Sequence, residues 1–200
     1  MRSTVALLAS LLLLPIPGFA QNNIAIDDLA HHPLEANFSP GGRLELRIRS
    51  AEIHIVGSDK DKIVVRAEGS QGSDSTDISA RFEASGDVGK LRVQGGPSSN
   101  VRITVQVPRR SNLLVRIFAG DVQVTDITGN KDIELSAGDL TIDVGDAGNY
   151  SHVEASVTSG SIEASPFGES RGGLFRSFEK FGNGKYKLVA HVGAGDLTLR

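Results

Sequence analysis

The stretch Ile133-Glu-Leu-Ser-Ala-Gly-Asp-Leu-Thr-Ile142 decides the fold that we predict for this chain. Apolar residues occupy every second position before and after an Ala-Gly-Asp corner centred on Gly138, and polar residues stand between them. A period of two indicates β-strands with one buried face. Glycine permits the left-handed backbone of a tight turn. The stretch therefore predicts two short strands joined by a sharp corner.

Five stretches of the chain repeat this pattern and superpose on one register. Their corner residues are Ala51, Gly120, Gly138, Gly160 and Gly195. The inward position two residues after the corner holds Ile53, Val122, Leu140, Ile162 and Leu197. The outward column before the corner reads Arg47, Arg116, Glu134, Ser156 and His191. The outward column after it reads His54, Gln123, Thr141, Glu163 and Thr198. Such recurrence indicates a stack of similar β units.

The recurring corner favours parallel stacking, because equivalent corners then lie above one another about 4.8 Å apart. An antiparallel sandwich gives no reason for the same corner at every second turn. The sequence therefore predicts an all-β, single-domain parallel β-solenoid with tight Gly-Asp corners. An antiparallel β-sandwich is the alternative.

The first twenty residues have the features of a secretory signal peptide. Arg2 precedes a ten-residue apolar run from Val5 to Leu14, and the small residues Gly18 and Ala20 stand at the cleavage positions. The run is too short to span a bilayer, and no second run of spanning length follows. We therefore expect an exported protein, either periplasmic or extracellular at the cell surface, without a transmembrane segment in the mature chain.

Domain organisation follows from the remaining pattern. We expect residues 21–37 to form a polar N-terminal leader or cap, and residues 38–200 to form one β-solenoid domain. Between two strands that fit the repeat, residues 166–185 do not, so we interpret them as a Phe-rich insertion. The sequence leaves the oligomeric state open.

Composition excludes several classes of site and partner. The chain has no cysteine, which rules out disulfides, cysteine nucleophiles and thiolate metal sites in this sequence. Its formal net charge is −3 at pH 7. Nucleic-acid affinity comes from neutralising phosphates, so we expect no nucleic-acid partner. No cofactor and no catalytic residue are predicted.

The segment Val101-Arg-Ile-Thr-Val-Gln-Val-Pro108, followed by repeated Ala-Gly-Asp-apolar-x-apolar units, resembles the bacterial DUF4097 (adhesin-like) family of exported β-solenoid proteins. The resemblance covers about Phe38 to Arg200. It implies a right-handed, single-domain solenoid of the adhesin-like kind. It implies no established activity and offers no catalytic residues to carry over.

The corner acids Asp121, Asp139 and Asp196 are candidate metal ligands. Stacked carboxylates are suitable for Ca²⁺, which takes six to eight oxygen ligands. The other interpretation, which we favour, is that each Asp accepts a hydrogen bond from a nearby backbone N–H. Calcium-binding β-rolls repeat Gly-Gly-x-Gly-x-Asp, and this chain has no such repeat.

The insertion combines aromatic and basic residues. Leu174, Phe178 and Phe181 have helical spacing, which favours one or two turns of amphipathic helix. Two interpretations stay open. The aromatic side chains form a lid over one end of the stack, or they form an exposed contact patch. The residues that we predict to bind a partner are Phe175, Phe178, Phe181, Arg171 and Arg176.

We predict a non-enzymatic binding or adhesion-type module of the bacterial cell envelope, with an envelope protein or a glycan as its partner. One alternative is an enzyme acting on envelope polysaccharide, either a lyase or a hydrolase, since such enzymes also use parallel β-helices. A second alternative is an accessory protein of an envelope-stress or membrane-sensing system. Fold does not decide between these, because function depends on sites.

Overall fold

The computed structural model describes residues 22–69, 78–95 and 101–200, so the predicted signal peptide lies outside the described residues. The strands of the first half are β1 (Asn22–Ile26), β2 (Leu34–Asn37), β3 (Arg43–Ser50), β4 (Glu52–Ser58), β5 (Lys62–Gly69), β6 (Ser79–Ser85), β7 (Val88–Gln94) and β8 (Val101–Pro108). Those of the second half are β9 (Asn112–Ala119), β10 (Val122–Thr125), β11 (Lys131–Ala137), β12 (Leu140–Ile142), β13 (Tyr150–Ala164), β14 (Glu169–Phe181), β15 (Tyr186–Ala194) and β16 (Leu197–Leu199). Short 3-10 turns are η2 (Ala147–Asn149) and η3 (Ser165–Phe167).

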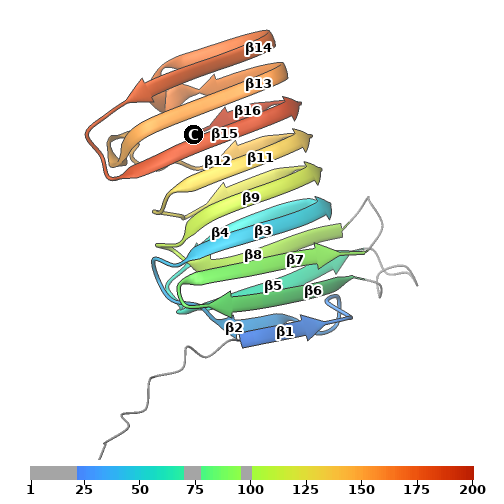
Figure 1. Ribbon diagram of the computed structural model, residues 1–200. Coiled ribbons are helices and arrows are strands. Elements are labelled where there is room, and N and C mark those ends of the chain that lie inside the picture. Colours follow the sequence, from blue (N-terminus) through green and yellow to red (C-terminus); the bar gives the residue numbers. More distant parts are fainter. Residues whose placement is uncertain (1–21, 70–77, 96–100) are drawn as a thin grey trace, which may run out of the picture.

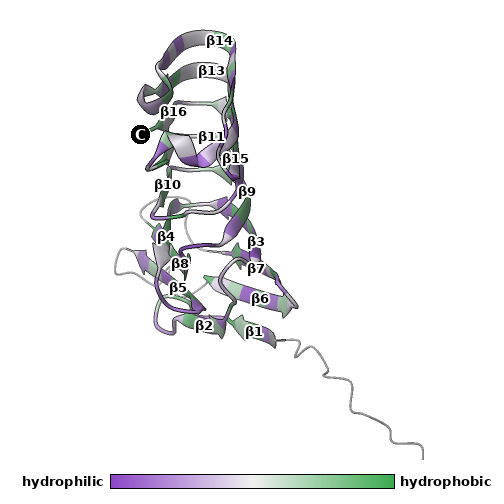
Figure 2. Ribbon diagram, turned by 90° about the vertical axis from the view of Figure 1, so that its left-hand side faces the viewer, coloured by the Kyte–Doolittle hydropathy of each residue, from purple (hydrophilic) through white to green (hydrophobic). Residues whose placement is uncertain are grey.

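All sixteen strands belong to one sheet that folds back on itself into two layers (Figures 1 and 2). One layer runs β1-β6-β7-β3-β9-β11-β15, and the other runs β16-β12-β10-β4-β8-β5-β2. The long strand β13 joins them, because its first part pairs with β15 and its last part with β16. At the opposite end β1 contacts β2. The sheet is therefore nearly closed into a flattened barrel.

The predicted register is confirmed in the pairing of the strands. In one layer Leu140 lies between Val122 and Leu197 in parallel ladders, and Leu197 lies beside Ile162. The other layer aligns Leu46, Val115, Ile133, Ala190 and Ala155 in the same way. Period-two alternation sets this register, since a slip of one residue would expose the whole apolar set.

The all-β class is confirmed, but the sheet is mixed rather than a wholly parallel solenoid. Parallel ladders fill its middle, whereas β1–β6, β6–β7, β2–β5, β5–β8 and β13–β14 are antiparallel. A parallel stack would leave the N–H and C=O groups of its terminal strands unpaired. Antiparallel strands cover those edges at both ends of the parallel region. The alternative, an antiparallel sandwich, fits only these end regions.

The order of the strands in space differs from their order in the chain. Strands β15 and β16 come last in the sequence, yet they lie between β11–β12 and β13 (Figure 1). Residues 22–37, predicted as a leader or cap, form β1 and β2, the two ends of the strand path. Residues 166–185 contribute β14, which pairs with β13 outside the main path.

The core lies between the two layers. In the rung formed by β11 and β12, Leu135, Leu140 and Ile142 are buried, whereas Glu134 is exposed and Thr141 is half-buried. This alternation continues through the neighbouring rungs and gives one continuous apolar interior. Within the described ranges no helix is long and apolar enough to cross a membrane.

Candidate functional site

The corner glycines are required by both conformation and space. Gly120, Gly138, Gly160 and Gly195 all have φ between 120° and 141°, a region that side chains with a Cβ rarely adopt. A Cβ on Gly138 would also collide with the backbone carbonyl of Gly120 in the next rung. The corners therefore stack backbone against backbone, as the repeat predicts.

The corner acids form a ladder of hydrogen bonds across the rungs. The backbone N–H of Asp196 donates to Asp139 Oδ1 at 2.9 Å, and that of Ser161 donates to Asp196 Oδ1 at 2.9 Å. The N–H of Asp139 lies 3.4 Å from Asp121 Oδ1. Each carboxylate thus accepts from a backbone N–H of the next rung rather than from its own turn.

Asp196 is the most strongly held of the three acids. The Ser161 hydroxyl and the Ser161 backbone N–H both donate to Asp196 Oδ1. These hydrogen bonds, the hydroxyl first, lower the pKa of the Asp196 carboxyl below its usual 3.8. Among residues 22–69, 78–95 and 101–200, no group of three or more His, Asp or Glu side chains is arranged to hold a metal ion.

The insertion is a strand, so the prediction of a helical turn is wrong. Strand β14 runs antiparallel to β13 from Glu169 to Phe181 and is the last strand at its end of the molecule (Figure 1). The reason is backbone pairing: β13 would otherwise expose one complete edge of N–H and C=O groups. A helix could not satisfy that edge.

The predicted partner-binding aromatic residues divide into two groups. Phe178 is 4% exposed and packs at a ring-centroid distance of 6.2 Å from Phe167, which in turn contacts Tyr150. These rings form the lid that one interpretation predicted. Phe178 is therefore not available at the surface.

The other large apolar side chains of β14 face solvent. Leu174, Phe175 and Phe181 are 63%, 80% and 73% exposed. Phe181 stacks on His152 with ring centroids 5.0 Å apart. His152 Nε2 lies 2.9 Å from Glu179 Oε1 and forms a hydrogen bond with it. We call Leu174, Phe175 and Phe181 the β14 patch. Both interpretations of the insertion thus describe part of it.

Phe175 has a strained backbone. Its φ is +52°, a left-handed value that a bulky residue rarely adopts. It shares this feature with Asp126 among the described non-glycine residues. The ring lies on the outer side of β14, three residues from the inward Phe178. Strain of this kind persists at functional positions, so we regard Phe175 as the centre of the patch.

The predicted arginines stabilise the strand itself. Arg171 Nε lies 3.0 Å from Glu169 Oε2, and its Nη1 donates to the Ser177 carbonyl. Arg176 Nε donates to the Gly172 carbonyl at 3.0 Å. Both side chains remain exposed. They border the β14 patch and place charge along an open edge, where it discourages pairing with strands of other chains.

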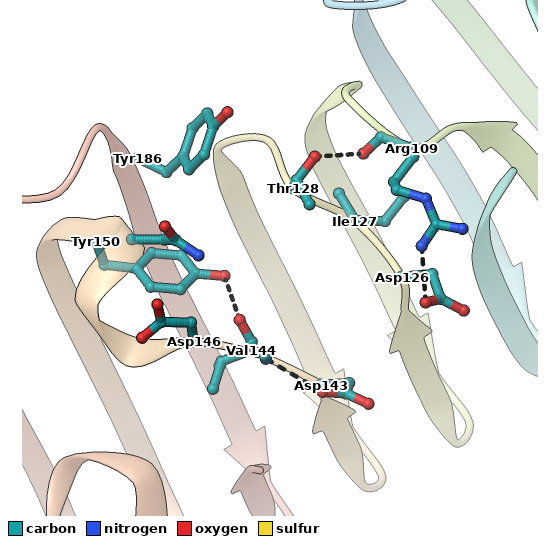
Figure 3. A pocket seen from close by; sticks show the side chains of 11 residues that line it. Arg109, Asp126, Ile127, Thr128, Asp143, Val144, Asp146, Tyr150 and Tyr186 are labelled. Carbon is teal, nitrogen blue, oxygen red and sulfur yellow. Dashed lines mark hydrogen bonds and ion pairs between the residues drawn. The ribbon is translucent and has the colours of Figure 1, made fainter. Parts of the chain in front are cut away.

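A buried lysine was not predicted. Lys131 is 1% exposed, and its Nζ donates to the Tyr150 hydroxyl at 2.7 Å. That hydroxyl donates in turn to the Val144 carbonyl (Figure 3). Burial lowers the pKa of Lys131 to about 8, and burial together with Asp143 raises the pKa of Tyr150 to about 12. Lys131 lies two residues before the inward Ile133, so strict alternation could have found it.

Tyr150 lines a small cavity of about 170 Å³ with Tyr186, Asp143 and Asp146 at its walls (Figure 3). Sites for drug-sized ligands are larger, at about 300–1,000 Å³. The Lys131–Tyr150 pair is a hydrogen-bonded network under the floor of this cavity. We interpret it as a buried polar network and assign no ligand to the cavity.

The structure also brings together three outward residues that are far apart in the chain. Glu134 on β11, His191 on β15 and Ser156 on β13 lie on adjacent strands at one level. Ser156 Oγ lies 2.9 Å from His191 Nδ1. Glu134 is instead paired with Arg116, whose Nε lies 3.1 Å from its Oε2. The order acid, histidine, serine is that of a hydrolase triad, but the carboxylate is turned toward the arginine.

Comparisons with known proteins give one structural likeness. No family model matches the chain, and no curated protein matches it in sequence. The resemblance to DUF4097 is therefore not confirmed. The fold is similar to the crystal structure of a putative cell adhesion protein from Clostridium sporogenes, with a TM-score of 0.51 and 11% identity. The match covers 84% of this chain and 99% of that one. At this identity the likeness concerns the fold alone.

Proposed function

We propose that this protein is a non-enzymatic binding or adhesion-type module of the bacterial cell envelope, and that the β14 patch is its contact surface. The β14 patch carries the proposal. The described residues include four large apolar side chains that are strongly exposed, and three of them are Leu174, Phe175 and Phe181. Exposed apolar area is costly in water, and several such side chains along one strand, with arginines beside them, have the composition of an interface.

The position of the patch supports a contact through side chains. Strand β14 is the outermost strand at its end of the sheet, so a partner can approach without displacing other elements (Figure 2). Arg171 and Arg176 oppose simple strand addition at this edge. The Phe175 ring is 80% exposed and its backbone conformation is fixed within β14, and a preorganised contact residue loses less entropy on binding.

Two further observations support location and role. Residues 1–20 have the composition of a signal peptide, in agreement with export. The structural neighbour is described as a putative cell adhesion protein, in agreement with an adhesion-type role. The partner in this proposal is an envelope protein or a glycan.

The test compares two exposed apolar sites. Residues 21–200 are immobilised and exposed to envelope extract and to a glycan array. The variant Leu174→Ser/Phe175→Ser should keep the parent melting temperature and lose at least tenfold in binding of the captured partner. Phe118→Ser replaces the strongly exposed ring that lies outside the β14 patch among the described residues, which is 67% exposed on β9 away from β14, and it should keep the binding of a protein or an uncharged glycan. Unchanged capture by the double variant would contradict the proposal.

The enzymatic alternative has one observation in its favour, the hydrogen bond between Ser156 and His191. If this pair is a nucleophile and its base, the parent should hydrolyse acylated envelope polysaccharide or a chromogenic ester, and Ser156→Ala should abolish the turnover. The binding proposal expects no turnover from either protein. Activity that Glu134→Gln also reduces would favour the enzyme.

A further inference from the structure

Four arginines stand side by side on the outer surface of one layer, on four neighbouring strands. Arg81 on β6 is the register partner of Arg92 on β7. Arg92 lies beside Arg47 on β3, which lies beside Arg116 on β9. Adjacent strands are about 4.8 Å apart. We call these residues the arginine row; it crosses the strands in the half of the molecule remote from β14 (Figure 1).

The side chains of the row point to solvent. Arg81, Arg92 and Arg47 are exposed and Arg116 is half-buried. Their neighbours along each strand are buried, as Leu46 and Ile48 are on either side of Arg47. Alternation therefore places all four guanidinium groups on the same outer face.

The neighbouring row of outward side chains has a different arrangement of charge. Two residues along the same strands, Lys90 lies between Glu83 and Glu45. Charges of opposite sign thus alternate there, which stabilises a sheet, whereas like charges directly opposite each other destabilise it. The arginine row has the destabilising pattern over four consecutive strands.

Among the described residues, carboxylates pair with the Arg116 end of the row. Arg116 lies 2.9 Å from Asp132 Oδ1 and 3.1 Å from Glu134 Oε2. In the described part of the chain no ion pair involves Arg81, Arg92 or Arg47. Within residues 22–69, 78–95 and 101–200, these three positive charges therefore have no carboxylate partner, on a protein whose formal net charge is −3.

A hollow lies beside the row at its Arg116 end. Arg47, Arg116 and the exposed ring of Phe118 line this hollow, whose volume is about 370 Å³. Glu134 also lines it, and its carboxylate is paired with Arg116. It therefore combines guanidinium groups with one aromatic face. A pyranose ring presents an apolar face to an aromatic side chain, while its acidic substituents can reach arginines.

We propose that the arginine row binds an anionic polysaccharide whose carboxylate, sulfate or phosphate groups follow one another across the strands. Guanidinium groups bind such anions through paired N–H donors, and an external chain of negative charge would remove the repulsion within the row. Phe118 packs against a sugar ring at one end. A single aromatic ring offers no series of stacking platforms for successive bases, so the row fits a polysaccharide better than a single-stranded nucleic acid.

This site is independent of the β14 patch, and different variants test the two. Fluorescently labelled heparin and polygalacturonate serve as anionic probes, and dextran serves as the neutral control. The parent should bind at least one anionic probe and not dextran, with an affinity that falls steeply as salt is added. Arg47→Gln/Arg92→Gln should weaken this binding at least tenfold. Lys90→Gln, which removes one exposed charge from the alternating row, should change it less than twofold.

Stability separates binding from a structural role. If the arginines serve a ligand, the double variant should melt at or above the parent temperature, because repulsion is relieved. A variant that melts well below the parent would assign the row a structural role and overturn the proposal. Failure of the parent to bind either anionic probe would also overturn it. So would tenfold tighter binding of single-stranded oligonucleotide, which would assign the row to nucleic acid.

Discussion

Replacing Lys131 by methionine should make the protein more stable at neutral pH. The pKa of Lys131 falls from 10.5 to about 8 on folding because the amine is buried. At about 1.36 kcal/mol for each pH unit, keeping it charged in the folded protein costs roughly 3 kcal/mol at pH 7. Methionine fills a similar volume without charge. It also removes the donor to Tyr150, which costs about 1 kcal/mol, so we expect a net gain of about 2 kcal/mol.

The pH dependence gives the sign of the effect. Between pH 8 and 10.5 the unfolded chain retains the Lys131 proton that the folded protein has lost. The unfolded state then binds more protons, and the stability of the parent rises with pH across this window. From pH 10 to about 12 Tyr150 acts in the opposite sense, because its hydroxyl ionises first in the unfolded chain. The methionine variant should lack the rise.

Urea unfolding followed by far-UV circular dichroism at pH 7, 8, 9 and 10 measures both effects. The advantage of Lys131→Met over the parent should shrink steadily toward pH 10. Lys90→Met is the matched control, since Lys90 is exposed on β7 and should show no such trend. A variant less stable than the parent at pH 7, with a difference independent of pH, would refute this reasoning.

Three further perturbations test the register, the corners and the acid ladder. Leu140→Ala should lower the free energy of unfolding by about 2–5 kcal/mol through lost burial and a cavity, whereas Thr141→Ala should change it little; similar urea midpoints would contradict the register. Gly138→Ala should lower the free energy of unfolding by roughly 1–3 kcal/mol from backbone strain, and further because the new Cβ collides with Gly120. Gly145→Ala, at φ +64° with open space around it, should cost the strain alone. Equal losses of stability in thermal melts would contradict the stacking of the corners. Asp196→Asn should lower the melting temperature at pH 7, because the lowered pKa of Asp196 in the folded protein stabilises it above pH 3.8 and this contribution is lost as the pH falls further. Calcium or EDTA should leave the melting temperatures of parent and variant unchanged. A rise with calcium that the variant lacks would indicate a metal site.

The sequence predicts the local geometry of this protein better than its long-range order. Alternation around Gly138 is a local property, so the inward position of Leu140 and the corner stacking follow from it. The placement of β15 and β16 between β11–β12 and β13 depends on pairing between residues far apart in the chain, which alternation does not encode. The antiparallel strands at the two ends of the sheet pair with whichever strand edges the parallel stack leaves open. Which edges these are depends on the assembled stack, and alternation does not give it.

The candidate site was predictable to a similar extent. The concentration of phenylalanines marked residues 166–185 as distinctive, and Phe175 and Phe181 are indeed exposed. The burial of Phe178 follows from its place opposite Ala155 on the inward face of β13, which the helical spacing concealed. The arginine row was hidden because two of its members, Arg81 and Arg92, lie outside the five repeats.

The late position of β15 and β16 in the chain has a consequence for biosynthesis. Until residues 186–199 emerge, β13 and β14 have no strands through which to join the rest of the sheet. The native sheet therefore closes only after β15 and β16 are available, and its many long-range contacts predict slow folding. In an exported protein, as residues 1–20 lead us to propose, a sheet that stays open until β15 and β16 are available would suit passage through a channel that accepts unfolded polypeptide. Folding would then finish after that passage, when β15 and β16 pair with β11, β12 and β13.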